Sequence, residues 1–171
     1  MKKRPSKDEY YLEIARTVAL RSTCLRRKYG AIVVKNDAIV ATGYNGPARG
    51  VVNCLDVGCI KEILNLPHGK AYEDCPAVHA EENCIVNAAR NGTLVFGGIL
   101  YISGVDSEGK LVEAEPCNRC KRILINAGIE RVVIRKSDGG IKYVNVSDWV
   151  SQDTKEYIEK LEKIKKDKEQ L

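Results

Sequence analysis

Two short segments of the sequence carry the side chains best suited to chemistry. His79 and Glu81 lie two residues apart in "AVHAEENCIV", and Cys117 and Cys120 lie three apart in "EPCNRCKRIL". The i, i+3 spacing puts both sulfurs on one face of a first helical turn, which Pro116 is suited to begin. A helix N-terminus also lowers thiol pKa values and favours thiolates. One imidazole and two thiolates make three ligands for zinc.

Three protein ligands leave one position of a tetrahedral zinc site open to water, which is typical of catalytic zinc. We expect the carboxylate of Glu81 to lie beside that position and to move the protons of the water. Taken alone, a histidine at a helix start is more often a cap or core residue, and a C-x-x-C pair has several uses. Together, H-x-E followed by P-C-x-x-C is the signature of zinc-dependent nucleobase deaminases.

The composition sets broad limits on location and partners. The chain has 171 residues, which suits one domain with a sizeable core. It has neither the apolar run of a membrane span nor the apolar core of a secretory signal. We therefore expect a cytoplasmic protein with no membrane partner, in which the seven cysteines are metal ligands or core residues rather than disulfides. The net charge of +5 fits an anionic small molecule better than a long nucleic acid, but decides little.

The order of predicted elements indicates an α/β fold. A capping box at Ser6 to Glu9 begins a helix that should end near Arg21, and β-branched runs on both sides of Asn36-Asp37 predict a hairpin. The remaining predictions are a helix over 79–91, a strand over 98–103, a helix over 117–127 and strands over 131–135 and 141–146. Strands joined by helices should be parallel, and helix N-termini should gather at one edge of the sheet.

Two regions do not fit this regular pattern. Residues 45–76 are rich in Gly, Pro and Cys, with one short helix predicted near 60–64, and are long enough for a loop to need an anchor. We place a catalytic domain at 1–150 and a charged helix at 151–171, packed on the domain or extending from it. The apolar residues of this helix fall on one face, namely Tyr157, Ile158, Leu161 and Ile164.

Four segments carry a resemblance to a known family: "RSTCLRRKYGAIVV", "ATGYNGPARGVVNC", "HAEENCIVNAARNG" and "PCNRCKRILINAGIERVV". Over about residues 21 to 134 the chain resembles the deoxycytidylate (dCMP) deaminase branch of the zinc-dependent cytidine deaminase superfamily. The pairing of "GYNG" with "ARNG" points to this branch. The resemblance implies a three-layer α-β-α fold, with a mixed five-stranded sheet and helices on both faces. It also implies hydrolysis of dCMP to dUMP and ammonia.

The resemblance also implies roles for single residues. His79, Cys117 and Cys120 would hold zinc, and Glu81 would carry protons between water, ring N3 and the leaving amine. The substrate would be held by Asn45 and by the backbone around Ala80 and Pro116. In hexameric family members "GYNG" is linked to control by dCTP and dTTP, so Tyr44 and Asn45 are candidates for an allosteric role. A homo-oligomer, hexamer or dimer, is expected.

A nucleotide substrate needs cations for its phosphate. The candidates near the motifs are Arg21, Arg26, Arg27, Lys28 and Arg90. Arginine is preferred because its guanidinium forks onto phosphate oxygens. We select Arg26 and Arg90.

The remaining cysteines suggest a second metal. Cys24, Cys54, Cys59 and Cys75 lie in or beside the irregular stretch, and the first three resemble positions that bind a structural zinc in some bacterial and phage relatives. His68 is the alternative fourth ligand, and free buried thiols are the alternative to a metal site. Cys84, inside a predicted helix, is expected in the core.

Other functions remain open at this point. A deaminase of another free pyrimidine nucleotide or nucleoside would use the same zinc apparatus. So would a tRNA adenosine deaminase, but it would need a broader basic and aromatic surface than a chain with one Trp and one Phe offers. A zinc module without activity would not explain Glu81. Residues 104–115 form a longer excursion than in family members, and we expect it at the rim of the active site.

Overall fold

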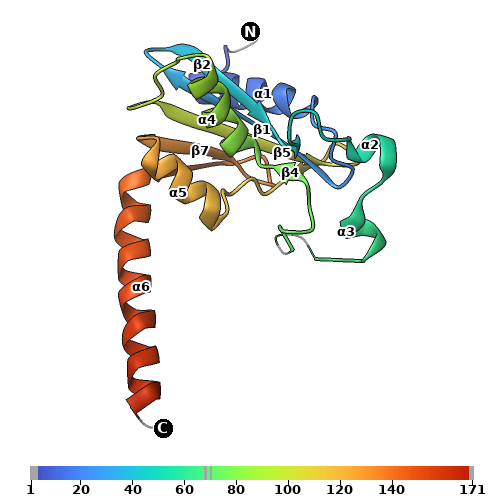
Figure 1. Ribbon diagram of the computed structural model, residues 1–171. Coiled ribbons are helices and arrows are strands. Elements are labelled where there is room, and N and C mark those ends of the chain that lie inside the picture. Colours follow the sequence, from blue (N-terminus) through green and yellow to red (C-terminus); the bar gives the residue numbers. More distant parts are fainter. Residues whose placement is uncertain (1–3, 68, 70, 170–171) are drawn as a thin grey trace.

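The computed structural model describes residues 4–67, 69 and 71–169 of the chain (Figure 1). The helices are α1 (Lys7–Ala19), α2 (Cys54–Val57), α3 (Ile60–Ile63), α4 (Ala80–Arg90), α5 (Asn118–Asn126) and α6 (Val146–Glu169). The strands are β1 (Arg27–Lys35), β2 (Ala38–Tyr44), β3 (Gly46–Pro47), β4 (Ala77–Val78), β5 (Ile99–Asp106), β6 (Leu111–Val112), β7 (Arg131–Arg135) and β8 (Ile141–Asn145).

Local sequence signals account for the ends of the main elements. The Ser6 hydroxyl accepts a hydrogen bond from the Glu9 N–H at 3.2 Å, so the predicted cap of α1 is present. Asn36 and Asp37 have φ values of 49° and 62°, the left-handed pair that a two-residue hairpin turn requires. Gly92, with a φ of 65°, follows the end of α4.

The main sheet has the strand order β2-β1-β5-β7-β8 and is mixed. Neighbouring strands are antiparallel except β5 and β7, which are parallel and joined through α5. This confirms the predicted mixed sheet, with one addition. The excursion after β5 contributes a sixth short strand, β6, which pairs with β5. Residues 45–76 also contain α2 and β3, which the sequence did not predict, and β3 pairs with β4 in a separate small sheet.

Helices cover both faces of the sheet, which gives the three-layer α-β-α fold. On one face α1 packs through Leu12 and Ala15 against the strands. On the other face α4 and α5 pack through Ala88 and Leu124. Cys84 is fully buried in this second layer, as predicted.

The last helix leaves the domain after its first turn (Figure 1). Val146 and Trp149 are buried in the core, whereas the apolar side chains further along α6 are exposed. The predicted boundary at residue 150 therefore falls inside this helix. Within the described residues, no helix combines the length and the apolar character needed to cross a membrane.

Candidate metal centre and active site

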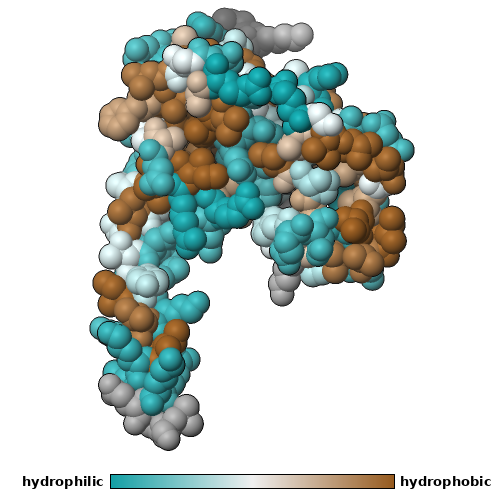
Figure 2. All heavy atoms as spheres, viewed as in Figure 1, coloured by the Kyte–Doolittle hydropathy of each residue, from teal (hydrophilic) through white to brown (hydrophobic). Residues whose placement is uncertain are grey.

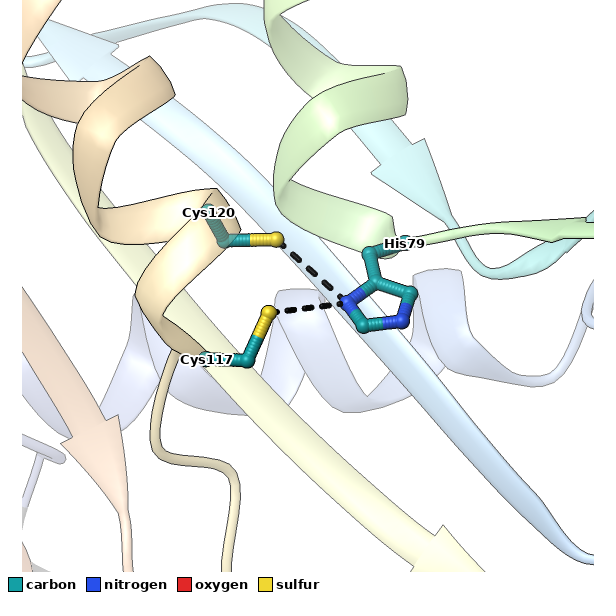
Figure 3. A group of neighbouring side chains, drawn as sticks. All are labelled: His79, Cys117 and Cys120. Carbon is teal, nitrogen blue, oxygen red and sulfur yellow. Dashed lines mark hydrogen bonds between the residues drawn. The ribbon is translucent and has the colours of Figure 1, made fainter. Parts of the chain in front are cut away.

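The N-terminal ends of α4 and α5 lie side by side and carry the predicted metal ligands (Figure 3). His79 immediately precedes α4, Cys117 precedes α5, and Cys120 lies in the first turn of α5. An ion pair joins the two helices, because Arg119 donates to Glu82 at 3.0 Å.

The three ligand atoms have the spacing that zinc requires. His79 Nδ1 lies 3.5 Å from the sulfur of Cys117 and 3.4 Å from that of Cys120. Tetrahedral zinc with ordinary Zn–S and Zn–N bonds places a nitrogen and a sulfur ligand about 3.6 Å apart. All three ligand atoms lie within 4.8 Å of one another. The donor set and its geometry therefore fit zinc.

The two sulfurs have opposite proton affinities. The Cys120 thiol and His79 lower the pKa of Cys117 to about 3, although burial opposes this shift. The Cys117 thiolate and burial raise the pKa of Cys120. Cys117 also raises the pKa of His79, more than burial lowers it. Zinc binds cysteine as the thiolate, so a metal ion would displace any proton that these sulfurs hold.

Glu81 lies in the first turn of α4 and is 5% exposed. Burial raises its pKa above the usual range of a carboxyl group. A buried carboxyl with a raised pKa, beside a metal centre, is suited to take up and release a proton near neutral pH. This is the role that the sequence predicted for it.

The position of α4 is fixed by direct contact with the backbone of β2. A Cβ atom on Gly43 would lie 2.2 Å from the backbone nitrogen of Cys84, so only glycine allows this approach. Asn83 and Asn87 each donate a hydrogen bond of 2.8 Å to a carbonyl of β2. These contacts determine where the first turn of α4, with its functional side chains, begins.

A cavity opens in front of His79 and Glu81, and several predicted substrate residues line it. They are Arg26, Asn45 and Ala80. The Asn45 side chain is buried and already has two backbone partners, since it accepts from Tyr29 N–H at 2.7 Å and donates to Arg27 C=O at 3.0 Å. It therefore ties the end of β2 to β1 as well as facing the cavity.

Other predicted residues lie elsewhere. Arg90 is exposed at the C-terminal end of α4, which the helical rise places about 15 Å from Ala80. Arg90 is not among the described residues that line the cavity, because the helix carries it away from His79. Its role at the phosphate stays a prediction from the sequence. Tyr44 is 39% exposed at the end of β2. Pro116 is fully buried between Glu115 and Cys117, which do line the cavity.

The four remaining candidate ligands gather on another part of the same cavity wall. Cys24, Cys54, Cys59 and Cys75 all line it. Burial raises the pKa of Cys54, and its three neighbouring thiols add to the effect. Their sulfurs are more widely spaced than the ligands at His79, which form the only group of three or more within 4.8 Å among the described residues. His68 lies outside the described residues.

Some residues of the cavity were not predicted from the sequence. The ring of Tyr72 lies 5.2 Å from the ring of His79, and Lys61 Nζ lies 5.0 Å from the Tyr72 ring. Glu113 and Glu115 also line the cavity, so the excursion at 104–115 reaches its rim as expected. Tyr72 stands three residues before Cys75, and this neighbour was the signal that could have identified it.

Comparison with known proteins identifies the family. The sequence model of the cytidine and deoxycytidylate deaminase zinc-binding region matches residues 5–136. The chain belongs to this family. A deoxycytidylate deaminase of Mycobacterium phage D29 is 36% identical over 138 residues, which cover 78% of this chain and 97% of the phage protein. The deoxycytidylate deaminase of Schizosaccharomyces pombe is 35% identical over 134 residues, but this chain spans only 38% of its length.

Solved structures of family members share the fold. The dCMP deaminase of cyanophage S-TIM5, in complex with dCMP and dUMP, is 27% identical. It superposes with a TM-score of 0.55 over 77% of this chain and 82% of the phage chain. Cytidine deaminase from Burkholderia pseudomallei is 17% identical to this chain. It superposes with a TM-score of 0.56 over 84% of this chain and 95% of the Burkholderia chain.

The contact at Gly43 leads to a prediction about the whole site. Gly43→Ala should push α4 off β2, because the added methyl group would overlap its backbone, and should lower the free energy of unfolding by about 1–3 kcal/mol or more. Zinc occupancy should fall with it, since His79 moves with the helix. Thr42→Ala, on the exposed neighbour, is the control and should change stability by less than about 0.5 kcal/mol. Denaturant unfolding and metal analysis measure both effects; an unchanged Gly43→Ala protein would show that this contact does not position the site.

Proposed function

We propose that this protein is a zinc-dependent dCMP deaminase that hydrolyses dCMP to dUMP and ammonia. The observation that carries the proposal is the zinc-spaced group of His79, Cys117 and Cys120 beside the buried carboxyl of Glu81. The names of the most similar relatives and the bound nucleotides of the S-TIM5 enzyme support this substrate.

The residues of the chain divide the work of the reaction. His79, Cys117 and Cys120 would hold zinc, which when bound makes a water molecule a nucleophile at neutral pH. Glu81 would take one proton from the attacking water and give it to ring N3 as the resulting hydroxide bonds to C4. The same carboxylate would then take the second proton, from the hydroxyl group now on C4, and give it to the amine, so that the C4 carbonyl forms, the C–N bond breaks and ammonia leaves. The backbone at Ala80, which lines the cavity, would contact the base.

The substrate phosphate meets cations in the cavity wall. Arg26 and Arg27 both line it, and Arg26 remains our choice for a forked contact with phosphate oxygens. The rim carries Glu113 and Glu115, which would repel the backbone of a polynucleotide. These charges favour a free nucleotide over tRNA.

A substrate assay with a single variant tests the activity. Ammonia release should be fastest with dCMP among dCMP, dCTP, deoxycytidine, cytidine and tRNA.

Glu81→Gln should keep zinc but lose about 10²- to 10⁴-fold in kcat, because its amide cannot carry the protons. Glu159→Gln, an exposed position on α6, should match the wild type. A Glu81→Gln enzyme with more than about a tenth of wild-type turnover would rule out this role. Adding dCTP or dTTP to the assay tests regulation near Tyr44 and Asn45.

We also propose a second, structural zinc, held by Cys24, Cys54, Cys59 and Cys75. The supporting observation is that these four thiols line one cavity, and that the other three lie close enough to Cys54 to raise its pKa. A closed four-thiolate site is the form that structural zinc usually takes, and it would draw the four sulfurs together. It would be the anchor that residues 45–76 require.

Metal content tests the second site directly. The fully loaded wild type should hold two zinc ions per chain, and Cys54→Ser should hold one, because a closed site does not tolerate the loss of a thiolate. Cys84→Ala removes a core thiol instead and should keep both ions. Elemental analysis of the three proteins gives the counts. One zinc per wild-type chain would contradict the proposal.

We further propose a homo-oligomer, since two apolar surfaces of the chain are exposed. One covers the α2–α3 region and the other follows α6 (Figure 2). In the first, Val57 and Ile63 are 65% and 76% exposed, and in the second Tyr157 is 68% exposed. Apolar patches of this kind mark protein interfaces.

Light scattering should give a particle mass that is a multiple of the chain mass, either a hexamer or a dimer. Ile63→Glu or Leu161→Glu should lower this mass, because each places a charge in one of the apolar surfaces. A monomeric wild type would contradict the proposed oligomer.

A further inference from the structure

Helix α3 exposes its apolar side chains to water and buries its lysine, which is the reverse of the usual arrangement. Its apolar residues face water, with Ile60 44%, Ile63 76% and Leu64 56% exposed, whereas Lys61 is only 8% exposed. A surface helix normally turns its apolar residues inward, and lysine is among the residues least often buried. Such a local conflict with folding preference is typical of a functional site.

The buried lysine lies in the wall of the active-site cavity. Lys61 lines the cavity in front of His79, and its Nζ lies 5.0 Å from the centre of the Tyr72 ring. The Tyr72 ring in turn lies 5.2 Å from the His79 ring. The Tyr72 ring therefore lies near both the ammonium group and the His79 ring, and it attracts the ammonium group by a cation–π interaction.

The cysteine cluster brings this lysine to the same wall as the arginine chosen from the sequence. Lys61 stands two residues after Cys59, and Arg26 stands two residues after Cys24. All four residues line one cavity. Two segments far apart in the sequence thus meet at one cavity, and each contributes one thiol and one cation to its wall.

We propose that Lys61 binds the phosphate of the nucleotide substrate together with Arg26, and so determines selectivity for a nucleoside monophosphate over the nucleoside. This rests on the proposed deaminase function. The compact ammonium group supplies a point charge and the guanidinium supplies a fork, which together match the two negative charges of a phosphate monoester. The cysteine-rich region is then part of substrate recognition as well as a structural element.

The experiment compares two substrates in three variants. Lys61→Met keeps the length of the stem without its charge, and kcat/KM for dCMP should fall by about tenfold to a hundredfold. For deoxycytidine, which has no phosphate, kcat/KM should stay within about twofold, because the lost contact is one it never made. Lys61→Arg should keep most of the activity with dCMP. Lys163→Met, which removes an exposed charge on α6, is the matched control and should leave both substrates unchanged.

A second measurement separates this proposal from the function on which it rests. Calorimetric binding of dUMP to the zinc-loaded protein should weaken in Lys61→Met, while binding of deoxyuridine and the zinc content stay the same. If the wild type does not deaminate dCMP, the deaminase proposal fails, but this binding comparison still decides the role of Lys61. Should Lys61→Met not fold, Lys61→Gln takes its place. Equal losses for both substrates, or an unchanged dCMP value, would overturn the proposal.

Discussion

The absence of one Cβ atom, at Gly43, allows the main chain of α4 to rest on the main chain of β2. No side-chain layer separates them there, so the helix has little freedom to slide or tilt. His79 and Glu81 lie at the start of this helix, so their positions are fixed by the same contact. The partner helix α5 is then held to α4 by packing and by the pair of Glu82 with Arg119. A nitrogen and two sulfurs from distant segments reach zinc spacing because both helices are fixed in this way.

The other half of the cavity is built on a different principle. Residues 45–76 have little regular structure and turn apolar side chains outward, so they cannot be held by a core of their own. Cys54, Cys59, Cys75 and the ring of Tyr72 line the cavity instead. Helices α4 and α5, held on the sheet, thus supply the metal ligands and Glu81. Residues 45–76, linked by the proposed second zinc, would supply a charge that binds the substrate.

The sequence was informative where spacing and residue type act together. The i, i+3 cysteines and the H-x-E segment identified the metal centre, because few arrangements other than adjacent helix starts bring such ligands together. Arg90 was chosen because it lies near a motif in the sequence, but the eleven residues of α4 place it far from the first turn of that helix and outside the lining of the cavity. Lys61 was missed because a lysine in a short helix is ordinarily exposed to solvent. The strands β3 and β4 have two residues each, too few to show any periodicity.

The tight seam where α4 rests on β2 offers a way to measure how often this part of the molecule opens. Cys84 lies in that seam, fully buried, and burial raises its pKa to about 12, so it is unreactive while the helix stays in place. A thiol reagent could reach it only when the helix lifts from the sheet. With the other thiols occupied by metal, the rate of alkylation at Cys84 would report how often α4 separates from β2.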